Sequence, residues 1–197
     1  PYCPRCGTPL STAEVSQGYK TVKERSAIVR FKVTGEDAYF LAWTTTPWTL
    51  PGNLAAAVHN DIEYVTVKVE NEGLLILAKG RLAQLGDVAY DVVAEMKGSE
   101  LVGRSYQSPF PYLAEQDFDK TNAWKIWHAD YVELGTEGTG AVHIAPAYGD
   151  DDMKLAQANN VPIKHHVDTA GHFMEFVTDF AGRLVKPKDD DAAGVDH

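Results

Sequence analysis

The chain has 197 residues, and its hydrophobic content of 44% is enough to form a sizeable core. Its formal net charge of −10 argues against a broad nucleic-acid-binding surface, because phosphate binding depends largely on Lys and Arg. No apolar run approaches the ~20 residues that a membrane-spanning helix needs, and no charged-then-apolar leader opens the chain. These properties indicate a globular protein that functions without a membrane.

Two cysteines near the start are spaced as C-x-x-C, in Cys3-Pro4-Arg5-Cys6-Gly7. This spacing before a glycine is typical of half a zinc knuckle, and a structural zinc ion takes four ligands. No second pair of cysteines follows in the sequence, so a redox disulfide stays open as an alternative. We expect residues 1–20 to form this half-site and a polar connector, and residues 21–197 to form the main domain.

From residue 21 onward, short extended runs alternate with turns. Tyr64–Val69 has the period-two alternation of a half-buried strand, and Asn71-Glu72-Gly73 predicts a hairpin turn after it. The predicted strands are Ala27–Val33, Ala38–Thr44, Leu54–Val58, Tyr64–Val69, Leu74–Leu77, Val88–Ala94, Ala123–Val132, Gly140–Ala145 and Ile163–Val167. Many short strands with few helices indicate a mainly β domain (α+β), a closed or nearly closed β-barrel with peripheral helices.

Helical patterns are fewer. Asp150–Asn159 begins with three acids, which the helix dipole and free N–H groups favour in a first turn, and continues with apolar residues at helical spacing. Arg81–Leu85 and Met174–Phe180 are shorter candidates.

Three consecutive threonines, Thr44, Thr45 and Thr46, follow an apolar run and precede Pro47. β-branched residues favour extended structure, and the residue before a proline is disfavoured in a helix. We therefore expect three hydroxyls on rigid backbone at the end of a strand. Taken singly, each threonine is also explained as a good strand former.

A second polar segment, Gly138–Asp152, has the sequence GTGAVHIAPAYGDDD. It places His143 in a predicted strand and Asp152 in the first turn of a predicted helix. From the residues alone, His143 is also explained as a structural histidine and Asp152 as a helix-start acid. The glycine-rich stretch lacks the Gly-Lys-Ser/Thr ending of a phosphate loop, and the sequence contains no G-x-S-x-G nucleophile elbow.

Three later histidines, His165, His166 and His172, are further candidate metal ligands. No H-E-x-x-H motif frames them, so the sequence favours this interpretation weakly.

Together, the two segments resemble the editing domain inserted in isoleucyl-tRNA synthetases. The first segment, Trp43–Asn53, has the sequence WTTTPWTLPGN, and the related valine and leucine enzymes carry arginine and an acid where this chain has Thr46 and Trp48. Both segments occur in the family's order and at about its spacing. With the first residues, the resemblance covers essentially the whole chain.

The resemblance implies a role for each candidate residue. Asp152 matches the carboxylate that holds the substrate's α-ammonium group. Thr44, Thr45 and Thr46 would donate to the ester carbonyl or the terminal ribose and orient a water. The residues that match pocket-wall or substrate-binding positions are His143, Asn53, Trp43 and Trp48. For Asn53 a plain turn role, and for the two tryptophans a core role, are the alternatives.

The implied function is hydrolysis of valyl groups from tRNA(Ile), and of valyl-adenylate. An apolar pocket can extract only ~1–3 kcal/mol from one methylene, a limit already known for the isoleucine enzymes themselves. A second site that admits valine and excludes isoleucine by size would overcome this limit on discrimination. Such a site needs rigid walls.

Several further expectations follow from the resemblance. The remainder of the synthetase would ligate isoleucine to tRNA with ATP and Mg²⁺ in the cytoplasm, and a later cysteine pair would complete the zinc site begun by Cys3 and Cys6. Pro1 and His197 are expected to be cuts in a longer protein, and editing itself should need no cofactor. The alternatives are an insert that only positions the tRNA 3′ end without hydrolysis, and a zinc-knuckle interaction module.

Overall fold

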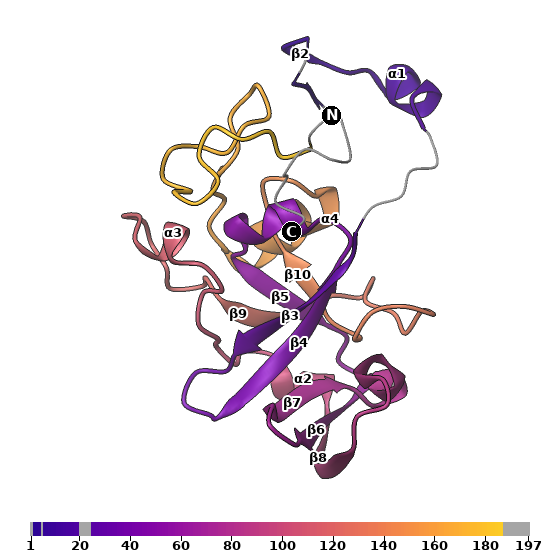
Figure 1. The fold of residues 1–197 in the computed structure, drawn as a ribbon. Helices are drawn as coiled ribbons and strands as arrows, with labels where there is room; N and C mark the ends of the chain where they lie inside the picture. Colours follow the sequence, from indigo (N-terminus) through magenta and orange to yellow (C-terminus); the bar gives the residue numbers. More distant parts are fainter. Residues whose placement is uncertain (1, 5, 20–24, 187–197) are drawn as a thin grey trace.

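The computed structural model describes residues 2–4, 6–19 and 25–186 (Figure 1). Its elements in chain order are β1 (Tyr2–Cys3), β2 (Thr8–Pro9), α1 (Thr12–Gln17), β3 (Ala27–Lys32), β4 (Ala38–Thr44), the 3₁₀ helix η1 (Pro47–Gly52), β5 (Ala55–Val58), β6 (Glu63–Val69), β7 (Gly73–Ala78), the 3₁₀ helix η2 (Lys79–Leu85), β8 (Tyr90–Lys97), α2 (Gly98–Leu101), α3 (Pro111–Ala114), β9 (Lys125–His128), β10 (Val142–Ile144) and α4 (Asp150–Asn159).

The first residues form a small hairpin, β1–β2, whose turn carries the C-x-x-C spacing. The Cys6 backbone N–H points at Cys3 Sγ at 3.3 Å, and the Gly7 N–H donates to the Cys3 carbonyl at 2.8 Å. Gly7 has a φ of +70°, which glycine adopts without strain. Helix α1 follows where a polar connector was predicted, and Ser11 and Glu14 form a capping box at its start.

The main sheet of the described chain contains eight strands in the order β8-β6-β7-β4-β10-β5-β9, with β3 paired to β4. It is mixed, because β4 runs parallel to both β7 and β10, and β5 runs parallel to β9. On one side β4 pairs with β3 along its length. On the other side it pairs with β7 at Ala38–Phe40 and with β10 at Trp43, so the sheet forks at this strand.

The prediction of a closed or nearly closed barrel is wrong, because the sheet is a strongly curled half-barrel that stays open. The ladder ends at β8 on one side and at β9 on the other. Two isolated bridges, Val33 with Tyr106 and Ser105 with Lys125, cross between the β3 end and β9 without forming a strand. The prediction of a mainly β domain with peripheral helices is confirmed.

Two apolar clusters fill the curled sheet. The first lies inside the curl and includes Phe31, Phe40, Tyr64 and Tyr106. The second packs β5 and β10 against helix α4 through residues such as Ile144 and Leu155. Helix α4 therefore lies over the strands that carry the second polar segment (Figure 1).

Most predicted elements exist with shifted ends, and the turn at Asn71-Glu72-Gly73 joins β6 and β7 as expected. Two predictions are wrong. Ile163–Val167 forms one isolated bridge at Val167 instead of a strand, and Met174–Phe180 forms turns instead of a helix. Both segments lie in the loop-rich region after α4, where Phe173 and Val177 pack into a satellite cluster without regular backbone pairing.

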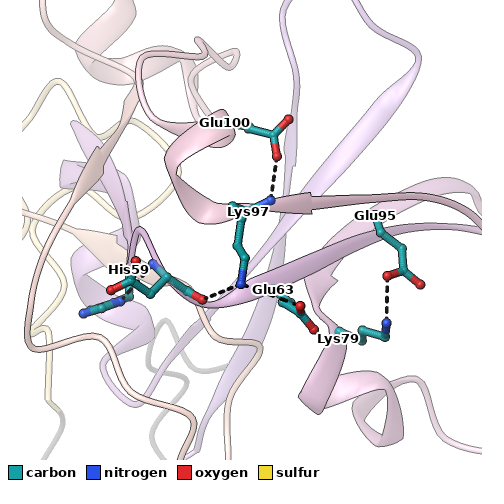
Figure 2. A network of polar contacts seen from close by, with 7 residues as sticks. His59, Glu63, Lys79, Glu95, Lys97 and Glu100 are labelled. Carbon is teal, nitrogen blue, oxygen red and sulfur yellow. Dashed lines mark hydrogen bonds and ion pairs between the residues drawn. The ribbon is translucent and has the colours of Figure 1, made fainter.

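A polar network ties β8 to its neighbours at the end of the molecule that carries β6, β7 and α2 (Figures 1 and 2). Lys97 Nζ lies 3.6 Å from Glu63 and 3.3 Å from the Asp61 carbonyl, and its backbone N–H donates to Glu100. Lys79 pairs with Glu95 at 2.7 Å. These side chains are exposed, so each ion pair contributes little to stability.

No helix in the part of the chain that the structure describes is long and apolar enough to cross a membrane.

Candidate functional site

Strand β10 brings the two polar segments together, because it lies between β4 and β5. Val142 pairs with Trp43 on β4, and His143 pairs with Ala56 on β5. The Trp43 N–H donates to the Ala141 carbonyl at 3.1 Å, and the Leu54 N–H donates to the Ile144 carbonyl at 3.0 Å. The ends of the first segment are thus fixed on both sides of the second.

Between those ends, the first segment turns through η1. Strand β4 stops at Thr44, Thr46 is the residue before the helix, and Pro47 occupies its first position, where a missing N–H costs nothing. The Thr46 carbonyl accepts from both the N–H and the hydroxyl of Thr49, at 2.9 and 2.8 Å. The turn therefore gathers threonine hydroxyls on one side.

A cavity of about 250 Å³ opens at this turn. It is lined by Trp43, Thr44, Thr45, Thr46, Trp48, Thr49, Val142, His143, Tyr148, Gly149 and Asp152. All the predicted catalytic residues and three of the four predicted wall residues are in this lining. Asn53, the fourth, lies buried behind His143 instead of facing the cavity.

The threonine hydroxyls form a chain along the wall. Thr44 Oγ1 lies 3.3 Å from Thr46 Oγ1, which lies 3.3 Å from Thr49 Oγ1. Thr44 Oγ1 also accepts from the Thr46 backbone N–H at 3.0 Å. Thr45 is the exposed member of the triplet, at the rim. Sequence analysis did not single out Thr49, although it lies within the same segment.

His143 is buried at the base of the cavity and joins both segments. Its Nε2 lies 2.6 Å from Thr49 Oγ1, and its Nδ1 lies 3.0 Å from Asn53 Nδ2. Burial, reinforced by nearby His166, lowers the pKa of His143 to about 3. The ring is therefore neutral at physiological pH. Its two hydrogen bonds fix it in place, as a rigid wall requires.

Asp152 differs from the two acids before it. Its Oδ2 accepts from the Ala145 N–H at 2.8 Å, and its carboxylate lines the cavity. Burial, with a smaller contribution from Asp151, raises the pKa of Asp152 to about 6 although the Ala145 N–H opposes that shift. Asp150 and Asp151 point outward and pair with Lys154.

Tyr148 and His166, which the sequence analysis did not assign to this site, hold the turn in place. The Tyr148 hydroxyl accepts from the N–H groups of His166 and Val167, at 2.8 and 3.0 Å. His166 Nε2 lies 3.1 Å from the Trp48 carbonyl, which can only accept, so Nε2 carries the proton. Tyr148 lies within the second segment, whereas His166 has no local sequence signal for this role.

The candidate metal ligands do not gather. Among the described residues no group of three or more His, Cys, Asp or Glu side chains is placed to hold a metal ion, so His165, His166 and His172 form no such site. Cys3 ends β1, and the Cys6 N–H points at the Cys3 sulfur, which fits two of the four ligands of a zinc knuckle.

Comparison with known proteins identifies relatives of the chain. No family model matches the chain. It is 48% identical over 192 residues to isoleucine–tRNA ligase 2 of Bacillus cereus, and 49% identical over 190 residues to isoleucine–tRNA ligase of Clostridium novyi. These alignments cover 97% and 96% of the chain but 18% of each relative. The chain is homologous to one segment of the isoleucine–tRNA ligases.

The fold agrees with that assignment. The structure of GlLeuRS-CP1 superimposes with a TM-score of 0.51 at 19% identity, over 64% of this chain and 44% of that one. At this identity the likeness shows a shared fold alone. The two chains thus share a fold over 64% of this chain.

Proposed function

We propose that the chain is the editing domain of an isoleucine–tRNA ligase and that it hydrolyses valyl esters of tRNA(Ile), and valyl-adenylate. The observation that carries the proposal is the meeting of Asp152 with the hydroxyls of Thr44 and Thr46 in one cavity of about 250 Å³. The homology to isoleucine–tRNA ligases supports the same substrate.

The groups suit ester hydrolysis without a protein nucleophile. A carboxylate at Asp152 binds the substrate's α-ammonium by a charge-assisted hydrogen bond. Threonine hydroxyls donate to the ester carbonyl or the ribose and position a water. That water attacks the carbonyl carbon, the ribose oxygen leaves with a proton, and the products are valine and uncharged tRNA.

The wall supplies selectivity by size. His143 and Thr49 are both buried and are hydrogen-bonded to each other, so this part of the wall cannot yield easily to an extra methylene. A wall role is preferred to a general base because burial lowers the pKa of His143 to about 3, which makes it a weak base, and because both of its ring nitrogens already have partners.

The wider setting belongs to the same proposal. The partners are the tRNA 3′ end carrying valine and the rest of the ligase, which would use ATP and Mg²⁺ in the cytoplasm. Editing uses no cofactor. A zinc ion held by Cys3, Cys6 and ligands elsewhere in the ligase would have a structural role.

The test compares release of the amino acid from valyl-tRNA(Ile) and isoleucyl-tRNA(Ile) by a ligase that contains this segment. We expect the valyl ester to be cleared much faster, and His143→Ala to narrow the difference. Equal hydrolysis of both esters would contradict the size-excluding site. Binding of the tRNA 3′ end without any hydrolysis would favour the non-catalytic insert instead.

A further inference from the structure

Behind the cavity, a chain of hydrogen-bonded, buried side chains runs from His143 through Asn53 to Tyr106, which is far from both polar segments in the sequence. The Tyr106 hydroxyl lies 2.8 Å from Asn53 Oδ1, and the Asn53 amide reaches His143. Tyr106 belongs to the connection between α2 and α3, and no local pattern in the sequence marks it.

The orientation of the Asn53 amide follows from its neighbours. Its Nδ2 lies 2.8 Å from the Ala55 carbonyl, which can only accept, so this contact assigns the NH₂ group to that side and shares with Tyr106 the role of holding the amide. The oxygen then faces Tyr106, whose hydroxyl donates to it. The second N–H of the amide points at His143 Nδ1 at 3.0 Å, which is nearer than the Ile144 carbonyl at 3.5 Å.

This arrangement selects one form of the His143 ring. Since Asn53 donates to Nδ1, the single proton of the neutral ring is on Nε2. Nε2 then donates to Thr49 Oγ1, and the Thr49 hydroxyl donates to the Thr46 carbonyl. With the other tautomer, Thr49 would have to donate to His143 and abandon that carbonyl.

We propose that Tyr106 is a positioning residue that holds Asn53 and thereby fixes the tautomer of His143 and the hydroxyl directions of Thr49 and Thr46 at the cavity wall. The consequence for hydrolysis rests on the proposed function, whereas the tautomer does not.

Packing and hydrogen bonds hold Tyr106 itself in one position. It is 3% exposed, stacks on Phe31 with ring centroids 4.7 Å apart, and its N–H donates to the Trp124 carbonyl at 2.8 Å. Burial raises the pKa of its hydroxyl well above the usual value, so the donor proton is always present. Asn53 is equally confined, because its carbonyl accepts from Trp124 Nε1 at 3.1 Å.

The experiment removes one oxygen. Tyr106→Phe leaves the ring stacked but takes the donor away from Asn53. Nuclear magnetic resonance of isotope-labelled histidine, with His143→Gln to assign the signal, reports which ring nitrogen carries the proton and needs no substrate. We expect Nε2–H alone in the unaltered protein and a mixture of tautomers in Tyr106→Phe.

The same variant should lose roughly 3- to 10-fold in kcat/KM for the valyl ester, the value of one neutral hydrogen bond, and should discriminate less against the isoleucyl ester. Tyr64→Phe is the matched control. Tyr64 is buried in the same cluster, but its hydroxyl donates to the Gly140 carbonyl at 2.5 Å, so this change should leave the tautomer and the selectivity intact.

An unaltered protein with the His143 proton on Nδ1 would overturn the inference, whether or not Tyr106→Phe folds. So would a folded Tyr106→Phe with an unchanged tautomer and unchanged selectivity. If the unaltered protein hydrolyses neither ester, the proposed function fails, and the tautomer comparison still decides the role of Tyr106.

Discussion

Helix α4 begins with three consecutive acids, Asp150, Asp151 and Asp152. Of these three, only Asp152 points inward. The side chains of Asp150 and Asp151 are 85% and 62% exposed, beside Lys154. Asp152 accepts from a backbone N–H and lines the cavity, where burial disfavours its charged form. A carboxylate kept in such a place at a cost to stability is typical of a binding function.

Removing this carboxylate should impair editing. Asp152→Ala loses a charge-assisted hydrogen bond worth roughly 1.5–3 kcal/mol, so the deacylation rate on valyl-tRNA should fall at least ~10-fold. Asp150→Ala is the control, since it removes a solvated helix-start acid and should leave the rate nearly unchanged. Normal editing by a folded Asp152→Ala, with a defect in Asp150→Ala, would place the anchor elsewhere.

The same carboxylate should make stability depend on pH. Its pKa is raised to about 6 in the folded protein, so the stabilisation that protonation gives is complete below the unfolded value of 3.8 and is lost as pH rises through 6. Asp152→Asn stays neutral throughout and can still accept from Ala145. At pH 7 it should therefore be more stable by about 1–3 kcal/mol, at ~1.4 kcal/mol per pKa unit.

Thermal unfolding at pH 4 and pH 7 checks this expectation. The gain should shrink toward pH 4, and Asp150→Asn should show no comparable gain at pH 7. A destabilised Asp152→Asn at pH 7 would mean that burial does not dominate the electrostatics of this carboxyl group.

At the scale of elements, the start of the second segment, residues 138–140, forms a tight turn that packs against two strands. Gly138 and Gly140 have φ values of +84° and +80°, and the Thr139 hydroxyl between them donates to the Leu41 carbonyl at 2.8 Å. The Thr139 carbonyl accepts from the Ala78 N–H. This turn bonds to both β7 and β4 just before β10 begins.

Gly140→Ala should destabilise the fold strongly. The new Cβ would lie 2.3 Å from Ala78 Cβ, and the backbone conformation is strained for any L side chain. Gly35→Ala is the matched control: its φ is +79°, but nothing lies within 4 Å of its new Cβ. We expect about 1–2 kcal/mol for the control and several kcal/mol for Gly140→Ala, measured by denaturant unfolding. Equal losses would show that the contact with Ala78 relaxes freely.

The sequence predicted what is local. Alternation located β6, the proline stop located the end of β4, and the acids located the start of α4 within one residue. Ser11-x-x-Glu14 is a capping box that also signalled α1, but it was missed inside a stretch interpreted as a connector. The strand predicted at Ile163–Val167 failed because Ile163 is exposed, and only Val167 joins the satellite cluster and makes an isolated bridge, with Phe173.

What the sequence could not predict depends on contacts between distant residues. The position of β10 between β4 and β5, which creates the cavity, is a pairing of segments about 90 residues apart, as the 94-residue separation of Thr49 and His143 shows. The open sheet likewise involves distant residues, because in the described chain isolated bridges at Ser105 and Tyr106, and no paired strand, link the end of β3 to β9. Tyr106 and His166 act through such contacts, so no local motif marks them.

At the scale of the whole molecule, the net charge limits how tightly the domain would bind the tRNA that the proposed function requires. With 28 acidic and 18 basic side chains, its long-range field repels a polyanion. The chain spans 18% of the length of its isoleucine–tRNA ligase relatives. If the cavity holds only the terminal nucleoside and its acyl group, most of the affinity for tRNA must come from the rest of the ligase.

The isolated chain should therefore bind tRNA weakly and with little dependence on salt. Each phosphate neutralised by a Lys or Arg releases counterions and steepens the fall of affinity with salt, by a slope of roughly −0.7 to −0.9 per contact. A domain that contacts one or two phosphates should give a log–log slope of about −1 to −2. The complete ligase should give a much steeper slope and tighter binding.

Fluorescence anisotropy of labelled tRNA between low and physiological salt measures both slopes. Hydrolysis of a small valyl ester of adenosine by the isolated chain is the companion measurement, because that substrate lacks the polyanion and needs only the cavity. We expect the two proteins to differ far less on this ester than on valyl-tRNA. Tight, steeply salt-dependent binding of tRNA by the isolated chain would contradict this division, because it would require a phosphate-binding surface on a domain of net charge −10.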